Sequence, residues 1–366
     1  MKTISWKRSR PVKRDTRMNG SNDHQPAKQH QREESVGVRP ARLDIIDPHH
    51  HLWAEAHGAG NGLYPVEQFL DDTRSQHLLG SVFIECGAMY RADGPIEFRP
   101  IGETEYAAGA GIAVDASDAT ARVCAGIVAS ASLTDLDHLD ALLDAHERAA
   151  DGRLRGVRHT GAWDASPEIP NGRVNPPQGL YRDDLFNRGF ARLAERGLSF
   201  DAWVYHPQLG DVAELAARNP DTTIIVNHCG GPLGAGPYAV DRAATFADWQ
   251  RGIRALAQQP NVVIKIGGLG MRVGPLSSTS RFENTDEDTD ALAEAIRPYV
   301  ETCIDAFGAG RSMFESNFPM DLPSYGYDTI WSAFELLARD YSDAERSLLF
   351  AQNANRVYRL GLTASE

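Results

Sequence analysis

The sequence predicts an α/β fold, a (β/α)8 TIM barrel with long loops after its strands. Three observations support this prediction: short apolar runs recur after residue 41, amphipathic stretches separate them, and polar residues gather where the runs end. The apolar runs predict strands at residues 43–47, 81–86, 122–129, 154–159, 199–205, 223–228, 261–267 and 311–316. Apolar residues near helical spacing predict helices between them, at residues 136–149, 184–196, 243–258, 288–306 and 327–339.

Segments rich in glycine and proline follow two of the predicted strands. Residues 87–103 follow the second strand and residues 163–181 follow the fourth, and both are predicted to be long loops. A third insertion, residues 268–289, follows the seventh strand and is a candidate lid. Because the loops after the strands build the sites of such barrels, we expect these segments near the site.

Composition predicts two parts in this 366-residue chain. Residues 1–40 hold ten Lys and Arg against four Asp and Glu, and this polar, aperiodic segment is predicted to be a disordered basic arm. Residues 41–366 are predicted to form the barrel. The formal net charge of -13 therefore divides into +6 for the arm and -19 for the predicted barrel.

The same composition narrows the class of partner. The predicted barrel is acidic and lacks the basic composition that nucleic-acid binding requires. No apolar run approaches the roughly 20 residues that cross a bilayer. Four widely spaced cysteines without a CxxC pair, and no secretory signal, lead us to expect reduced thiols and a cytoplasmic protein. We expect a small-molecule substrate and no nucleic-acid or membrane partner, and homo-oligomerisation stays open.

The first predicted strand leads into a segment that runs from Asp47 to His51. Because side chains alternate on a strand, Asp47, His49 and His51 are expected to point to one side and His50 to the other. Two neutral imidazoles at this spacing can bind one divalent metal or polarise one substrate oxygen, with a carboxylate nearby to orient them. The segment therefore predicts a two-imidazole site at the end of the strand.

Polar residues also lie at the ends of five other predicted strands: Glu85, Arg158, His159, His206, Asn227, His228, Glu315 and Asn317. Barrel enzymes place their chemistry at this end of the strands, so we expect most of these side chains to converge. His159 has the opposite parity to Arg158 and could instead face the helices. Lys265, inside the seventh strand, is expected to pair with a buried carboxylate, with catalysis as the alternative. Asp321 is expected to cap a loop or a helix.

Four segments of the chain resemble the amidohydrolase superfamily: residues 46–53, 156–159, 226–231 and 314–319. Within the superfamily they are most similar to a branch of lactone hydrolases, which includes 2-pyrone-4,6-dicarboxylate, sulfomuconolactone and sugar-lactone hydrolases. The resemblance covers residues 43–360 and is more specific for the superfamily than for a substrate.

The resemblance also implies roles for individual residues. It implies a divalent metal, with Zn²⁺ the expected ion, held by His49, His51 and His206. Some members of the branch work without metal, so a metal-independent mechanism stays open. His228 would lie beside the reacting centre as a catalytic residue. The predicted substrate-binding residues are Arg158, His159 and Trp53, and Arg158 suits a carboxylate or carbonyl oxygen because its donors form a planar fork.

One position departs from the family pattern. Where the family usually has an aspartate at the end of the eighth strand, this chain has Asn317. A neutral amide cannot take a proton from water, so Asn317 cannot be the general base. Glu315, which shares its strand parity, and Glu85 on the second strand are the candidate bases among the predicted catalytic residues.

Together these features predict a hydrolase that opens a lactone of a small acidic metabolite. Activated water would attack the carbonyl, Arg158 and the imidazoles or metal would stabilise the oxyanion, and His228 would protonate the leaving alkoxide. The nearest alternative is a non-oxidative decarboxylase of an aromatic or dienoic acid. A second alternative, suggested by Asn317, is a binding barrel that has lost catalysis.

Overall fold

The structure is a computed structural model that describes residues 43–55, 62–172, 174–276 and 281–363. The predicted basic arm, residues 1–40, lies outside the described residues. Among the helices that are described, none is both long enough and apolar enough to cross a membrane.

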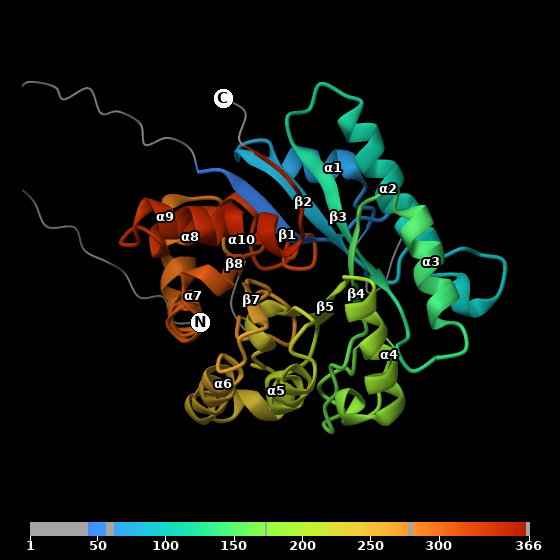
Figure 1. Ribbon diagram of the computed structural model, residues 1–366. Helices are drawn as coiled ribbons and strands as arrows, with labels where there is room; N and C mark the ends of the chain where they lie inside the picture. The colour runs from blue at the N-terminus through green and yellow to red at the C-terminus, as the bar shows by residue number, and fades with distance from the viewer. Residues whose placement is uncertain (1–42, 56–61, 173, 277–280, 364–366) are drawn as a thin grey trace, which may run out of the picture. The chain divides into compact units, whose positions relative to one another are not determined.

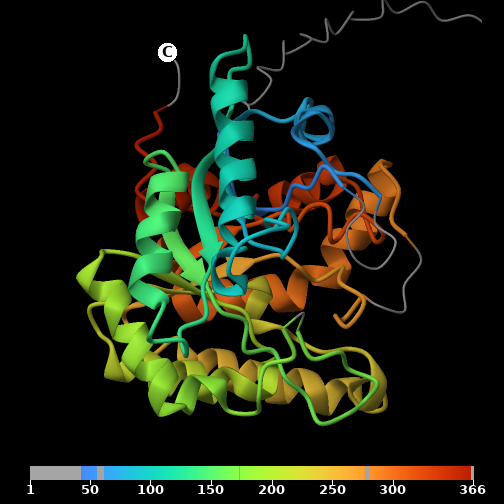
Figure 2. The ribbon, with the colours of Figure 1, turned by 90° about the vertical axis from the view of Figure 1, so that its right-hand side faces the viewer.

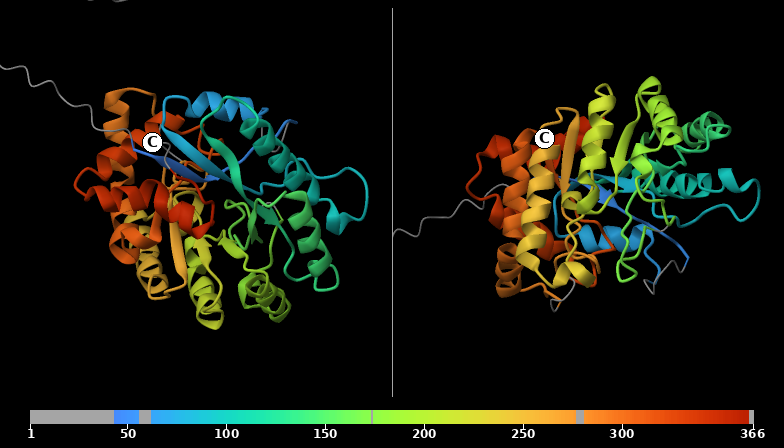
Figure 3. Two further views of the ribbon diagram at one scale, coloured as in Figure 1. Left: turned by 45° about the horizontal axis from the view of Figure 1, so that its top comes forward. Right: turned by 90° about the horizontal axis from the view of Figure 1, so that it is seen from below.

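The described residues form a (β/α)8 barrel, as the sequence predicts (Figures 1 and 3). Its parallel strands are β1 (Ile45–His50), β2 (Leu78–Ile84), β3 (Arg122–Ser130), β4 (Leu154–Arg158), β5 (Ser199–Ala202), β6 (Ile224–Val226), β7 (Val262–Ile266) and β8 (Ser312–Phe314). They lie side by side in sequence order from β1 to β8. The ring closes where His50 bridges Phe318, just beyond β8, and where the His51 amide donates to the Phe318 carbonyl at 2.8 Å.

Ten α-helices accompany the strands: α1 (Val66–Thr73), α2 (Ile101–Asp115), α3 (Leu139–Ala149), α4 (Asp184–Glu195), α5 (Leu209–Arg218), α6 (Arg242–Leu256), α7 (Asp286–Phe307), α8 (Tyr327–Leu337), α9 (Asp343–Ser347) and α10 (Asn353–Val357) among the described residues. The sequence predicted α3, α4, α6, α7 and α8 but not α1, α2 or α5. Neighbouring helices pack against one another around the strands, and Figure 2 shows α2 beside α3.

Two apolar layers hold the barrel together. The larger layer lies between the strands and the helices, for example where Phe186 and Phe190 of α4 pack on Phe200 of β5. A smaller cluster joins residues of the other strand face, such as Ile225 and Val263, to Tyr358 after α10. Because both faces of each strand are covered, the strands read as nearly continuous apolar runs, which explains why the sequence revealed them.

The predicted long loops are present. Residues 87–95, 163–172 and 174–179 carry no helix or strand, and a helical turn at Ile96–Phe98 leads from the first loop into α2. Of the third insertion, residues 277–280 lie outside the described residues, and α7 begins at Asp286. Its role as a lid stays a prediction.

Candidate active site

Three imidazoles lie together where β1 and β6 end. His49 and His51 come from β1 and the residue after it, and His228 follows β6. The His49 ring centroid is 5.0 Å from that of His51 and 4.4 Å from that of His228. His50 points the other way and stacks on Phe69 of α1 at 4.2 Å. The predicted alternation of these histidines is therefore observed.

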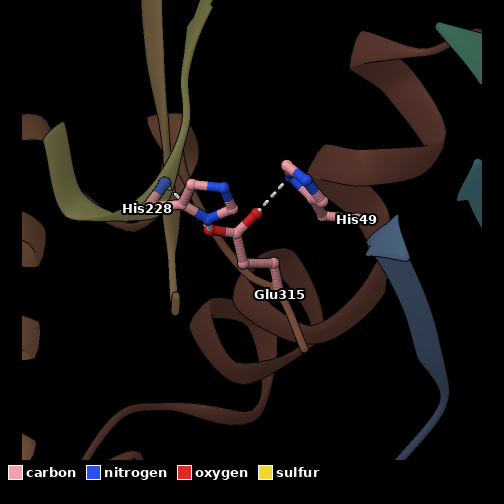
Figure 4. Close-up of side chains that lie close together, drawn as sticks. All are labelled: His49, His228 and Glu315. Carbon is pink, nitrogen blue, oxygen red and sulfur yellow. Dashed lines mark hydrogen bonds and ion pairs between the residues drawn. The ribbon is translucent and has the colours of Figure 1, made fainter. Parts of the chain in front are cut away.

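Glu315, the residue after β8, joins two of these imidazoles (Figure 4). Its Oε1 accepts hydrogen bonds from Nδ1 and the backbone amide of His228 at 2.8 and 2.9 Å. Its Oε2 lies 2.8 Å from Nδ1 of His49. Oε1 accepts from Nδ1 of His228, so in that neutral ring Nδ1 carries the proton and Nε2 is bare. Nδ1 of His49 also lies beside the Lys265 ammonium, so Glu315 alone does not set the tautomer of His49.

His51 has the same tautomer as His228 for a different reason. Its Nδ1 lies 2.8 Å from the carbonyl oxygen of Ile84, which can only accept a hydrogen bond. Nδ1 of His51 therefore donates, and its Nε2 is bare in the neutral ring. Three neighbouring imidazoles thus have their Nδ1 groups engaged, which fixes the ring orientations.

Two buried cations flank His49. Arg158, at the end of β4, donates from Nε to Glu85 Oε1 at 2.6 Å, and its Nη1 lies 3.5 Å from His49 Nε2. Lys265 of β7 donates to Asp201 Oδ1 at 2.6 Å, and its Nζ lies 3.3 Å from His49 Nδ1. The expected pairing of Lys265 with a buried carboxylate is therefore confirmed.

Burial and charge favour the neutral form of the imidazoles. Loss of solvent lowers the pKa of His49, His51 and His228. The positive charge of Arg158 lowers all three pKa values further. The Glu315 carboxylate acts in the opposite direction on His228, because its negative charge and its hydrogen bond raise the pKa of that ring. Near neutral pH the rings can therefore accept a proton.

A cavity of about 550 Å³ opens beside Arg158. Its described lining comes from the strand ends and from both long loops, and it includes Glu85, Tyr90, Glu97, Asp135, His138, Arg158, His159, Pro176 and Asp183. The cavity is large enough for a small molecule, and Arg158, which lines it, also lies 3.5 Å from Nε2 of His49. His159 also lines the cavity, and its ring centroid lies 5.6 Å from that of Phe186 in α4.

His206 is not part of the cluster. It lies in the helical turn His206–Gln208 after β5, where its Nδ1 accepts a hydrogen bond from the Leu233 amide at 3.2 Å. Its Nε2 therefore carries the proton in the neutral ring, 3.9 Å from Asp248 of α6. His206 is not among the described residues whose donor atoms come together as a possible metal site, so its role as a metal ligand stays a prediction.

Asn317 also turns away from the imidazoles. Its side chain donates to Asp321 Oδ1 at 2.9 Å, and Asp321 further accepts from the Gly270 amide at 3.2 Å. Asp321 is fully buried, and by accepting from the Gly270 amide it caps the loop after β7, as the sequence predicted; burial raises its pKa to about 7. The pair connects the loops that follow β7 and β8.

Asp47 and Trp53 make contacts other than those that the sequence suggested. Asp47 does not touch an imidazole ring: it accepts hydrogen bonds from Ser316 Oγ at 2.6 Å and Tyr327 OH at 3.2 Å, and so joins β1 to β8. Trp53 donates to the Gly62 carbonyl and lines a separate cavity, together with Tyr64. Neither position supports the direct site role that its motif implied.

Sequence reasoning missed the groups that support Lys265. Asp201 of β5 accepts hydrogen bonds from Asn227 Nδ2 at 2.8 Å and from Tyr358 OH at 3.0 Å. The only signal for Asp201 was one acidic residue inside a predicted apolar strand. Gly268 was also missed: an added Cβ there would lie 2.3 Å from His228 Nδ1.

Among the described residues, one group could hold a metal ion: His49, His228 and Glu315, whose donor atoms lie within 4.8 Å of one another. This group overlaps the predicted metal site only at His49.

Comparison with known proteins finds similarity over most of the described residues. The family model described as Amidohydrolase matches residues 46–360. A Sinorhizobium fredii protein, y4mH, is 36% identical over 336 residues, which cover 87% of this chain and 99% of that protein. The L-fucono-1,5-lactonase of Burkholderia multivorans is 33% identical over 224 residues, 58% of this chain and 67% of that enzyme.

Solved structures are similar over the same range. Crystal structures of an amidohydrolase from Burkholderia multivorans, one with bound HEPES and one with bound Zn, cover 87% of this chain and 99% of their own. Their TM-scores are 0.65 and 0.63, at 26% and 25% identity.

Proposed function

This chain belongs to the amidohydrolase family, and we propose that it is a hydrolase that opens a lactone ring. One observation carries the proposal: Glu315 holds two imidazoles by their Nδ1 groups, next to a guanidinium at the edge of a cavity. This arrangement combines a base with a group that binds an oxyanion. The similarity to an L-fucono-1,5-lactonase supports the choice of a lactone.

His228 is the proposed general base. Its Nδ1 donates to Glu315 at 2.8 Å, so Nε2 is free to take a proton from water. Glu315 stabilises the imidazolium that forms, as a buried carboxylate does behind a catalytic histidine. This changes the role predicted for Glu315, because its Oε1 already accepts from His228 and its Oε2 lies 2.8 Å from His49 Nδ1.

The reaction then follows in two steps. The water oxygen bonds to the lactone carbonyl carbon while its proton moves to His228, and the carbonyl oxygen becomes an oxyanion. Arg158 stabilises this oxyanion with its guanidinium, which Glu85 holds in place at 2.6 Å. The bond to the ring oxygen breaks next, and the His228 imidazolium returns the proton to that oxygen. Lactone and water thus yield one hydroxy acid.

The cavity lining favours a neutral lactone that bears hydroxyl groups. Besides Glu85, which pairs with Arg158, the lining presents the carboxylates of Glu97, Asp135 and Asp183. Arg158 is the one arginine or lysine among the lining residues that the structure describes. Carboxylates accept hydrogen bonds from hydroxyls but repel a substrate with further carboxylates. We therefore favour a sugar-type lactone over the acidic lactone expected from sequence.

The protein's own groups do not match a divalent ion in their present arrangement. Imidazole and carboxylate donors suit zinc by type. Glu315 Oε1, however, accepts from the His228 N–H at 2.8 Å, and the two nitrogens of His49 face the cations Lys265 at 3.3 Å and Arg158 at 3.5 Å. The expected Zn²⁺ therefore stays a prediction, and no step above depends on it.

A lactone panel tests the proposed function. Neutral sugar 1,5-lactones and 2-pyrone-4,6-dicarboxylate would be offered to the purified protein, with acid release followed by pH-stat and carbon dioxide by headspace analysis. We expect acid release from a neutral lactone and its loss in His228→Asn. Carbon dioxide without acid release would support the decarboxylase instead, and tight binding without turnover would support the binding barrel.

A further inference from the structure

Lys265 is unusual in this chain because of its residue type. After residue 40 the sequence contains 26 arginines but no other lysine. The one lysine is fully buried in β7, next to the site. An ammonium group is a compact point charge, whereas a guanidinium is a wide planar fork. The exception therefore falls at a fully buried position, where a compact cation needs less room than a guanidinium.

The amine is held firmly in place. Its Nζ donates to Asp201 Oδ1 at 2.6 Å, and Asp201 in turn accepts from Asn227 and from Tyr358 OH. Burial lowers the pKa of Lys265, while the negative charges of Asp201 and Glu315 raise it. A buried ion pair with satisfied oxygens keeps such an amine charged.

This amine lies where a metal would have to compete with it. Nζ is 3.3 Å from His49 Nδ1, which is one of the donor atoms of the group that His49 forms with His228 and Glu315. A divalent ion bound by that group would lie within a few ångströms of the ammonium. At that separation, away from water, like charges repel strongly.

We propose that the Lys265 ammonium is the resident cation of the His49–His228–Glu315 cluster and takes the place of a divalent metal ion there. The amine balances the negative charge of Glu315 and Asp201 without occupying the bare Nε2 atoms of the imidazoles. The cluster then keeps its imidazoles free for proton transfer. The inference concerns charge in the cluster and does not depend on which substrate is hydrolysed.

Zinc binding tests the proposal without an activity assay. Purified wild-type protein, Lys265→Met and Lys265→Gln would be titrated with Zn²⁺ against a chromophoric chelator, and bound zinc would be counted by mass spectrometry after dialysis. We expect little zinc in the wild type. Loss of the ammonium charge should strengthen zinc binding by at least about tenfold in either variant.

Arg153→Met is the matched control, because it removes another buried cation, one that pairs with Asp115 at 2.8 Å and lies outside the cluster. Its zinc binding should equal that of the wild type. A tight zinc ion in the wild type that His49→Ala removes would overturn the proposal, even if both Lys265 variants fail to fold. Folded Lys265 variants that bind zinc no better than the wild type would overturn it too. Inactivity toward every lactone would count against the proposed function and leave this result unchanged.

Discussion

At the scale of single residues, Glu315 decides what the imidazoles can do. The sequence placed this carboxylate at the site and suggested it as a base, but it could not show where the two oxygens point. That depends on how the chain after β8 meets β1 and β6 in space. The observed contacts, 2.8 Å to His49 and 2.8 Å to His228, make Glu315 a positioning residue.

The variant Glu315→Gln tests this role. A glutamine offers only one acceptor oxygen, so one imidazole loses its partner and faces an amide N–H group. We expect kcat to fall by roughly 10²-fold or more, on the scale of general acid–base groups, with a smaller change in KM. Steady-state kinetics on the lactone identified by the panel provide the measurement.

Glu103→Gln is the control for the same chemical change. Glu103 is buried in α2 and accepts hydrogen bonds from the amides of Cys86 and Ala88, outside the imidazole cluster. We expect a lower Tm in this variant but a wild-type kcat. A folded Glu315→Gln protein with wild-type kcat would contradict the role given to Glu315.

At the scale of elements, the strands were easier to predict than the helices or the turns. Each observed strand overlaps its predicted range, because apolar side chains cover both faces of the barrel wall. Helix α2 was missed because its many small residues form no clear apolar stripe. Residues Ala107–Gly111 alone are three alanines and two glycines. His206 was misplaced because β5 ends at Ala202 and the following turn carries the ring away.

The turn after β7 offers a prediction at this scale. Gly268 has φ +65°, and an added Cβ would lie 2.3 Å from His228 Nδ1. In Gly268→Ala the imidazole must therefore move from Glu315, and we expect kcat to fall at least about tenfold, because small misplacements of catalytic groups are costly. Kinetics and a circular dichroism spectrum of the variant measure activity and fold separately.

Gly197→Ala separates the backbone effect from the contact. Gly197 has φ +62°, and no heavy atom lies within 4 Å of the Cβ position. This substitution carries a similar backbone cost, about 1–2 kcal/mol for a left-handed residue, without disturbing the site. Equal kcat values in the two alanine variants would show that Gly268 does not position His228.

At the scale of the whole molecule, the barrel was predictable because strand pattern, helix spacing and polar strand ends all indicate the same fold. The hydrogen-bond directions within the site were not, since they depend on contacts between residues far apart in the sequence. Burial also removes many titratable side chains from solvent, which shifts their pKa values. Their combined effect should appear in the pH dependence of stability.

Four imidazoles outside the proposed reacting centre, three buried and one (His159) half-buried, have lowered pKa values: about 3 for His50 and about 4 for His146, His159 and His206. Unfolding returns them to about 6.5, so below that pH the unfolded chain binds four more protons and stability falls. Two carboxyls act in the opposite direction, because burial raises the pKa of Asp47 to about 6 and of Asp321 to about 7.

Near pH 5 these six groups alone give the unfolded chain a net two protons more than the folded chain. The lowered pKa values of His49, His51 and His228 add to this difference, so the free energy of unfolding should fall by at least about 3 kcal/mol for each pH unit. Domains of this kind have only about 5–15 kcal/mol of stability, so we expect acid unfolding between about pH 4 and 5. Urea unfolding followed by tryptophan fluorescence at pH 7, 6 and 5 measures the slope. His77→Gln, which alters an exposed imidazole beside Asp44, should leave it unchanged. Equal free energies of unfolding at pH 7 and 5 would show that these imidazoles do not remain neutral in the folded protein.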